Sequence, residues 1–94
     1  PGYRDLAVLR RVIVAGADLP AADRRALLDP IAAPGRPYRP LALEQLALLS
    51  VEAGDAQAAI TAFEALSQDQ QATQGIRQRA AQMIVALGGT PATN

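Results

Sequence analysis

The spacing of apolar residues near the end of the chain constrains the fold most strongly. Five of them recur three or four positions apart or side by side, namely Ile76, Ala80, Met83, Ile84 and Leu87. This spacing places all five on one face of an α-helix. Gly88-Gly89 would end that helix, so the pattern predicts a helix over about residues 73–87. Residues 90–94 are then expected to form a disordered tail.

Similar apolar spacing recurs in earlier segments that proline or glycine separates. We expect helices over about residues 4–15, 21–28, 40–53 and 55–66. The apolar residues are mainly Ala and Leu, which are strong helix formers, whereas strands favour β-branched and aromatic residues. Because the connections are short, neighbouring helices should run antiparallel. The sequence therefore predicts one all-α domain over residues 1–89, built from about five helices arranged as antiparallel hairpins.

Several local expectations concern the faces and ends of these helices. The third helix is apolar almost all round, which predicts a central position. Asp18 should cap the second helix, with Pro20 in its first turn, and Asp55 should cap the fourth. Tyr38 should anchor the proline-rich connector over residues 34–40. The first helix should bury one apolar face, made of Leu6, Leu9, Val12 and Ile13.

The side-chain types present argue against an enzyme. The chain has no His, Cys or Lys, so the usual general base, thiol nucleophile and Schiff-base amine are missing. Its acidic residues form no compact metal-binding loop. The net charge is zero and the arginines are spread over several helices, which argues against a nucleic-acid partner. We therefore expect no enzymatic activity and no cofactor or metal.

The pair of helices around Gly54-Asp55 resembles a tetratricopeptide repeat, a helix–turn–helix unit. Small residues at Ala47 and Ala59 would let two helices approach closely, and Phe63 would fill the space towards the next helix. The resemblance implies a fragment of a right-handed solenoid. An ordinary helical hairpin is the alternative, because the segment departs from the repeat pattern at Ser50, Leu66 and Gln71.

The order of motifs along the chain resembles a more specific family. The motifs are Tyr3-Arg4-Asp5-Leu6-Ala7, Leu27-Leu28, Tyr38, Leu41 to Leu49, Ala53-Gly54-Asp55, Phe63 and Thr73 to Ala80. This order is similar to the C-terminal half of the bacterial family that includes the ancillary subunit of the Sec translocon. The resemblance implies a longer, inner-membrane-anchored parent, with this domain on the periplasmic side and the N-terminal membrane helix missing from this sequence. It also implies protein partners, such as translocon or periplasmic chaperone components.

In a tetratricopeptide pair the first helix lines the concave surface, which predicts a protein-binding face on the third helix. The residues of that face would be Leu41, Glu44, Leu48, Val51 and Glu52. We expect Glu44 and Glu52, two turns apart, on a solvated side. Two functions remain open. One is a protein-interaction module of the bacterial envelope. The other is a structural or oligomerisation domain without a client groove, in which the apolar side chains of this face pack on missing repeats or on a second copy.

Overall fold

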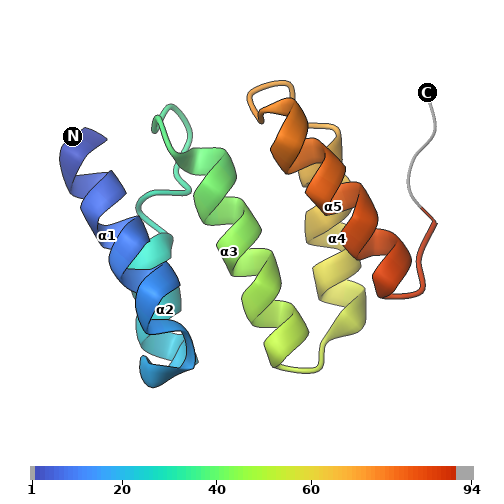
Figure 1. Cartoon of the computed structure of the whole chain (residues 1–94), viewed down its shortest axis with the longest axis horizontal. Helices are drawn as coiled ribbons and strands as arrows, with labels where there is room; N and C mark the ends of the chain where they lie inside the picture. The colour runs from blue at the N-terminus through green and yellow to red at the C-terminus, as the bar shows by residue number, and fades with distance from the viewer. Residues whose placement is uncertain (1, 91–94) are drawn as a thin grey trace.

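A computed structural model describes residues 2–90, and this part of the chain contains α-helices and no strand (Figure 1). The elements are α1 (Gly2–Ala15), the 3-10 helix η1 (Gly16–Asp18), α2 (Ala21–Leu28), α3 (Arg39–Glu52), α4 (Ala56–Ser67) and α5 (Gln74–Ala86). The all-α prediction is confirmed, and the expected α-helix boundaries agree with the structure to within two residues. Of the expected tail over residues 90–94, all but Thr90 lies outside the described residues.

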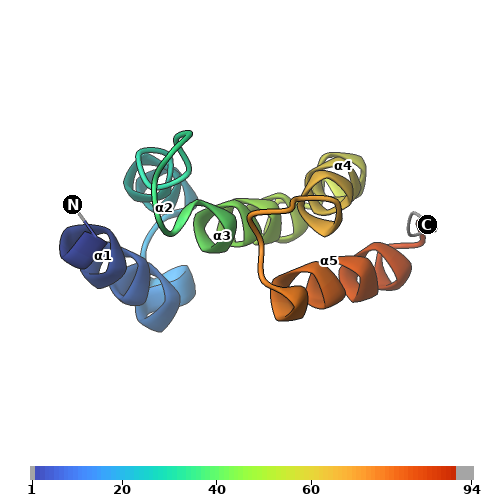
Figure 2. The same ribbon diagram turned by 90° about the horizontal axis from the view of Figure 1, so that it is seen from above.

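Helix α3 lies in the middle of the molecule, as its apolar surface predicted. Seen from above, α1 and α2 lie on one side of α3, and α4 and α5 lie on the other (Figure 2). Consecutive α-helices run in alternating directions, and α1 and α5 stand in front of α2 and α4 in the view of Figure 1. None of the described helices is long and apolar enough to cross a membrane.

Two hydrophobic clusters lie against α3, one on each side. The N-terminal cluster consists of Leu9, Val12, Leu28, Ile31, Ala42 and Leu49. The C-terminal cluster consists of Ala47, Ala59, Phe63, Leu66, Ala72, Ile76, Ala80 and Ile84. Leu41 packs against both clusters, and Tyr38 packs against the first, as expected of an anchor for the connector. Because α3 contributes to both clusters, it joins the two halves of the fold.

Two helix starts are capped by side chains at the turns that the sequence indicated. Asp55 Oδ1 accepts a hydrogen bond from the backbone N–H of Ala58 at 3.1 Å, which confirms its predicted role. Thr73 Oγ1 accepts one from the N–H of Ile76 at 3.2 Å. Gly54 has a φ of +79°, so it takes the left-handed conformation that the tight turn before Asp55 requires.

The expectation that Asp18 caps α2 is wrong. Pro20 occupies the cap position, and no side chain hydrogen-bonds to the start of this helix. Asp18 instead belongs to η1, and the extended residue Leu19 separates it from the helix that it was expected to cap. The carbonyl of Leu19 accepts a hydrogen bond from Arg24 Nε at 2.8 Å, so Arg24 stabilises this turn.

The predicted buried face of α1 is wrong at Ile13, a residue that is 51% exposed. The buried residues of this helix are Asp5, Leu9 and Val12, spaced four and three positions apart. Ile13 follows Val12 and is therefore turned about 100° away from that line. Its side chain faces the surface described next.

Candidate functional site

A groove on the face seen in Figure 1 has α3 as its floor and α1 and α5 as its walls; it is called the front groove below. Its volume is about 580 Å³. The lining residues are Ile13 from α1, Leu41, Glu44, Gln45 and Leu48 from α3, Phe63 from α4, and Arg79, Gln82, Met83 and Ala86 from α5. The groove therefore combines three consecutive helices, α3, α4 and α5, with the distant helix α1.

Apolar side chains dominate the front groove, and several of them remain open to solvent. Leu48 is 37% exposed and Ile13 is 51% exposed, while Leu41 and Met83 are half-buried. Large apolar side chains left exposed together on a concave surface mark a place where a partner could bury them. The amides of Gln45 and Gln82 lie beside them and offer both donors and acceptors for a peptide backbone.

An ion pair crosses the front groove from α5 to α3. Arg79 donates from Nε and Nη2 to the two carboxylate oxygens of Glu44, at 2.8 and 2.9 Å. The hydrogen bonds to Glu44, and secondly its charge, raise the pKa of Arg79. The Glu44 side chain is only 11% exposed, whereas that of Arg79 is 54% exposed. A guanidinium has five N–H donors, so Arg79 keeps three that this pair does not use.

The expectation of a solvated side for Glu44 and Glu52 is wrong for Glu44, which is buried under Arg79. Glu52 is exposed, but its carboxylate accepts two hydrogen bonds from Arg24 Nη1 and Nη2, both at 2.7 Å. Eight residues along a helix correspond to a rotation of about 80° beyond two full turns. The two carboxylates therefore point towards different helices, Glu44 towards α5 and Glu52 towards α2.

The structure brings three of the five predicted face residues together in the front groove, namely Leu41, Glu44 and Leu48. Val51 packs against the C-terminal cluster instead, and Glu52 pairs with Arg24. The walls of the groove, from Ile13 on α1 and from Arg79 and Met83 on α5, were not predicted as parts of a site. The helical periodicity of α1 and α5 shows which of their apolar residues share a face. It does not show which face of either helix meets α3.

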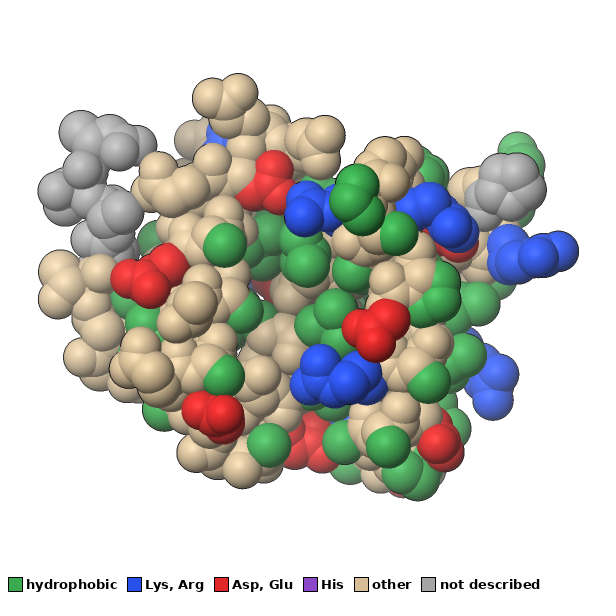
Figure 3. Space-filling model, turned by 180° about the vertical axis from the view of Figure 1, so that it is seen from behind, with side chains coloured by type: hydrophobic (Ala, Val, Ile, Leu, Met, Phe, Trp, Pro, Cys, Tyr) green, Lys and Arg blue, Asp and Glu red, His purple; other side chains and the backbone are tan. Residues whose placement is uncertain are grey.

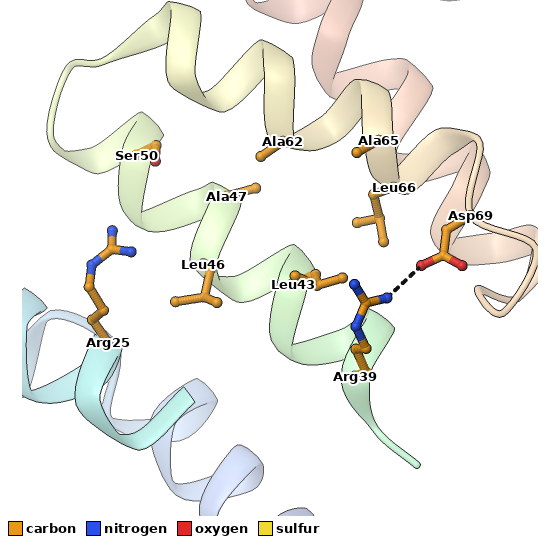
Figure 4. Close-up of a pocket in the computed structure, with 10 residues that line it drawn as sticks. All are labelled: Arg25, Arg39, Leu43, Leu46, Ala47, Ser50, Ala62, Ala65, Leu66 and Asp69. Atoms are coloured by element: carbon orange, nitrogen blue, oxygen red, sulfur yellow. Dashed lines mark hydrogen bonds and ion pairs between the residues drawn. The ribbon is translucent and has the colours of Figure 1, made fainter. Parts of the chain in front are cut away.

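A second groove lies on the opposite face, between α2 and α4; it is called the rear groove below. Its volume is about 460 Å³. Viewed from behind, the molecule shows hydrophobic side chains with both basic and acidic side chains beside them (Figure 3). The lining residues are Arg25, Arg39, Leu43, Leu46, Ala47, Ser50, Ala62, Ala65, Leu66 and Asp69 (Figure 4). No sequence pattern predicted this groove.

Within residues 2–90, no three acidic side chains gather where they could hold a metal ion together. Comparisons with models of protein families, with characterised proteins and with solved structures find no match to this chain.

Proposed function

We propose that this chain is a non-enzymatic protein-interaction module that binds a peptide segment of another protein in the front groove. The observation that carries the proposal is the exposure of Leu48 and Ile13 beside the half-buried Leu41 and Met83. The segment would place apolar side chains on these four residues. A carboxylate or carbonyl group of the segment would accept hydrogen bonds from the unused donors of Arg79.

The packing of α3, α4 and α5 supports a narrower form of this proposal, in which the chain is part of a tetratricopeptide-like right-handed solenoid. Ala47 and Ala59 are 1% and 0% exposed, so small residues lie where two helices meet. Phe63 is fully buried in the cluster that α5 completes. In such a solenoid the front groove, with α1, α3 and α5 around it, would belong to the concave surface.

The order of motifs from Tyr3 to Ala80 supports a cellular role for the parent protein in bacterial envelope protein handling. Under this proposal the domain lies on the periplasmic side, attached to an inner-membrane anchor outside this sequence. Its partners are translocon or periplasmic chaperone components. The front groove is the surface through which it would contact them.

Selection from a random-peptide library on the 94-residue chain tests the binding function. We expect apolar peptides with an acidic residue to be enriched, and their addition should shift the amide NMR signals of Leu41, Gln45 and Gln82. Leu48→Glu should weaken binding at least tenfold, because it places a charge on the apolar floor. The matched control is Val85→Glu, since Val85 is 59% exposed on α5 and does not line the groove. Enriched peptides that bind both variants equally would contradict the proposal.

A second candidate function is self-association, and an exposed line on α1 favours it. Tyr3 is 93% exposed and Val14 is 87% exposed. They are eleven residues apart, which brings them to nearly the same side of the helix after three turns. Sedimentation equilibrium decides between the two functions. A dimer that Val14→Glu dissociates, with no peptide binding in the front groove, would support self-association.

A further inference from the structure

The arginines of this chain differ in how completely their donors are used. Arg24, Arg36 and Arg79 each donate two hydrogen bonds to a single carboxylate, at distances of 2.6–3.0 Å. Such two-point pairing is the favoured geometry between a guanidinium and a carboxylate. Arg25 and Arg39, which both line the rear groove, lack it.

The guanidinium of Arg39 has few hydrogen-bond partners within the described residues. Its one hydrogen bond runs from Nη1 to Asp69 Oδ2 at 3.4 Å, near the outer limit for such a contact. Its Nε is buried and has no hydrogen-bond partner within residues 2–90. The other oxygen of Asp69 is already engaged, since Oδ1 accepts a hydrogen bond from the N–H of Gln71 at 2.8 Å. The Arg39 side chain is 29% exposed, so it remains within reach of a ligand.

Arg25 has no ion pair in the described part of the chain. Asp29 lies one turn further along α2, but the two side chains do not come within salt-bridge distance. Figure 4 shows the Arg25 side chain on the far side of the groove from α4, extending towards the part of α3 that carries Leu46 and Ser50. Arg39 lies at the opposite end of the groove, beside Asp69. The rear groove thus has a cation at each end.

The surface between the two arginines is mainly apolar, and alanines on α3 and α4 keep part of it low. Leu43, Leu46 and Ala47 form the floor on α3, and Ala62 and Ala65 lie on the α4 wall. The lining residues of α3 extend from Arg39 to Ser50, a length of about 16 Å along the helix. Short side chains at a contact allow a further helix to approach closely, since the distance between helix axes depends on them.

We propose that the rear groove binds an amphipathic helical segment of another protein, one that carries acidic side chains at both ends of an apolar face. The apolar face covers Leu43, Leu46 and the alanines. The two carboxylates pair with Arg25, which has no ion pair in the described part of the chain, and with Arg39, whose side chain makes only the 3.4 Å hydrogen bond to Asp69. Acidic residues eleven positions apart on a helix lie on nearly the same side and are separated by about 16 Å along its axis, which suits cations at the two ends of a groove of this length. This surface is separate from the front groove, and both can be occupied together.

The test uses a synthetic 15-residue helical peptide with Leu and Ala on one face and two Glu residues eleven positions apart. A second peptide carries Gln at both acidic positions. Binding to the 94-residue chain is measured by fluorescence anisotropy, and the contact surface is mapped by amide NMR shifts. We expect the Glu peptide to shift the signals of Leu43, Ala47, Ala62 and Ala65. It should bind at least tenfold more tightly than the Gln peptide, with a preference that falls as salt is added.

The double variant Arg25→Gln/Arg39→Gln should bind the two peptides equally. Arg25→Gln alone should reduce the preference for the Glu peptide severalfold. This single variant replaces the double variant if the change at Arg39 unfolds the chain, because Arg25 is exposed and its substitution breaks no ion pair. The control is Arg10→Gln on α1, which should leave the preference unchanged because Arg10 is exposed and lines neither groove. Equal binding of both peptides to the unmodified chain, or shifts confined to the front groove, would overturn the proposal. So would binding of anionic lipid vesicles with no binding of either peptide.

Discussion

Phe63, on α4, has the largest fully buried side chain and packs in the hydrophobic cluster that α4 forms with α3 and α5. Removing its ring leaves a cavity that the surrounding helices fill only in part. Phe63→Ala should therefore lower the free energy of unfolding by about 3–5 kcal/mol, measured by urea denaturation. Val85→Ala is the control, since Val85 is 59% exposed and should change stability by less than about 0.5 kcal/mol. Similar midpoints for the two variants would show that Phe63 is not a core residue.

Glu52 should make stability depend on pH in the acid range. The hydrogen bonds from Arg24 lower the pKa of Glu52 below its ordinary value of 4.5, helped by the charge of Arg24 and opposed by desolvation. A lowered pKa in the folded state stabilises the fold fully above pH 4.5, and this stabilisation is lost as the pH falls from there through the folded-state pKa.

Thermal unfolding at several pH values tests this effect. Glu52→Gln should destabilise the chain at pH 7 and should flatten the decline in Tm below pH 4.5. Glu64→Gln is the matched control, because Glu64 is exposed on α4 and forms no ion pair in the described structure. If Tm declined below pH 4.5 in Glu52→Gln as steeply as in the unmodified chain, the pair with Arg24 would not persist in solution.

At the scale of elements, two glycines should respond in opposite ways to the same substitution. Gly54, in the turn between α3 and α4, has a φ of +79°, where a Cβ atom is strained. Gly54→Ala should cost about 1–2 kcal/mol of unfolding free energy. Gly75 lies in the first turn of α5, and a Cβ atom there would meet its nearest neighbours at 3.8 and 3.9 Å, an ordinary contact. Gly75→Ala should therefore stabilise by about 0.4–1 kcal/mol.

Denaturant titration of both variants checks this pair of effects, and each variant serves as the control for the other. Stabilisation by Gly54→Ala would mean that the turn does not use a left-handed residue. Destabilisation by Gly75→Ala would mean that α5 starts later than Gln74. The two turns thus report separately on how α4 and α5 begin.

The whole molecule has two hydrophobic clusters that share one helix, so its parts should open with different free energies. Helix α3 packs against both clusters, whereas α1 takes part in the N-terminal cluster alone. Backbone amides in the middle of α3 should exchange with solvent more slowly than those in the middle of α1 by at least tenfold. Hydrogen exchange followed by NMR measures this ratio. Slower exchange in α1 than in α3 would contradict the central role of α3.

The position of α3 also explains why the molecule has grooves on opposite faces. The helices before and after it are displaced alternately to the front and to the rear, so neither pair covers α3 completely (Figure 2). Apolar residues of α3 therefore remain accessible on both sides, Leu41 and Leu48 in front and Leu43 and Leu46 behind. A fold of this kind can contact two partners through one helix.

The positions of the helices and of the turns between them can be predicted from local sequence patterns alone. Helical periodicity, glycine at a left-handed turn and a capping Asp55 act over a few residues, so they can be read locally. Local signals failed for Ile13 and Asp18, where one step of helical rotation and one extended residue changed the outcome. The predicted face of α3 came from the tetratricopeptide resemblance, and only Leu41, Glu44 and Leu48 of its five residues line the front groove.

The grooves and ion pairs that those helices form together depend on contacts between residues far apart in the sequence. Glu44 meets Arg79 across 35 positions and Glu52 meets Arg24 across 28, and no local pattern pairs these charges. The walls of both grooves depend on which face of α1, α2, α4 and α5 turns towards α3. The face that each helix turns inward is set by the burial of each hydrophobic cluster as a whole. The free energy gained by burying apolar surface depends on the total area buried and not on the direction of any single contact, so no short segment reveals it.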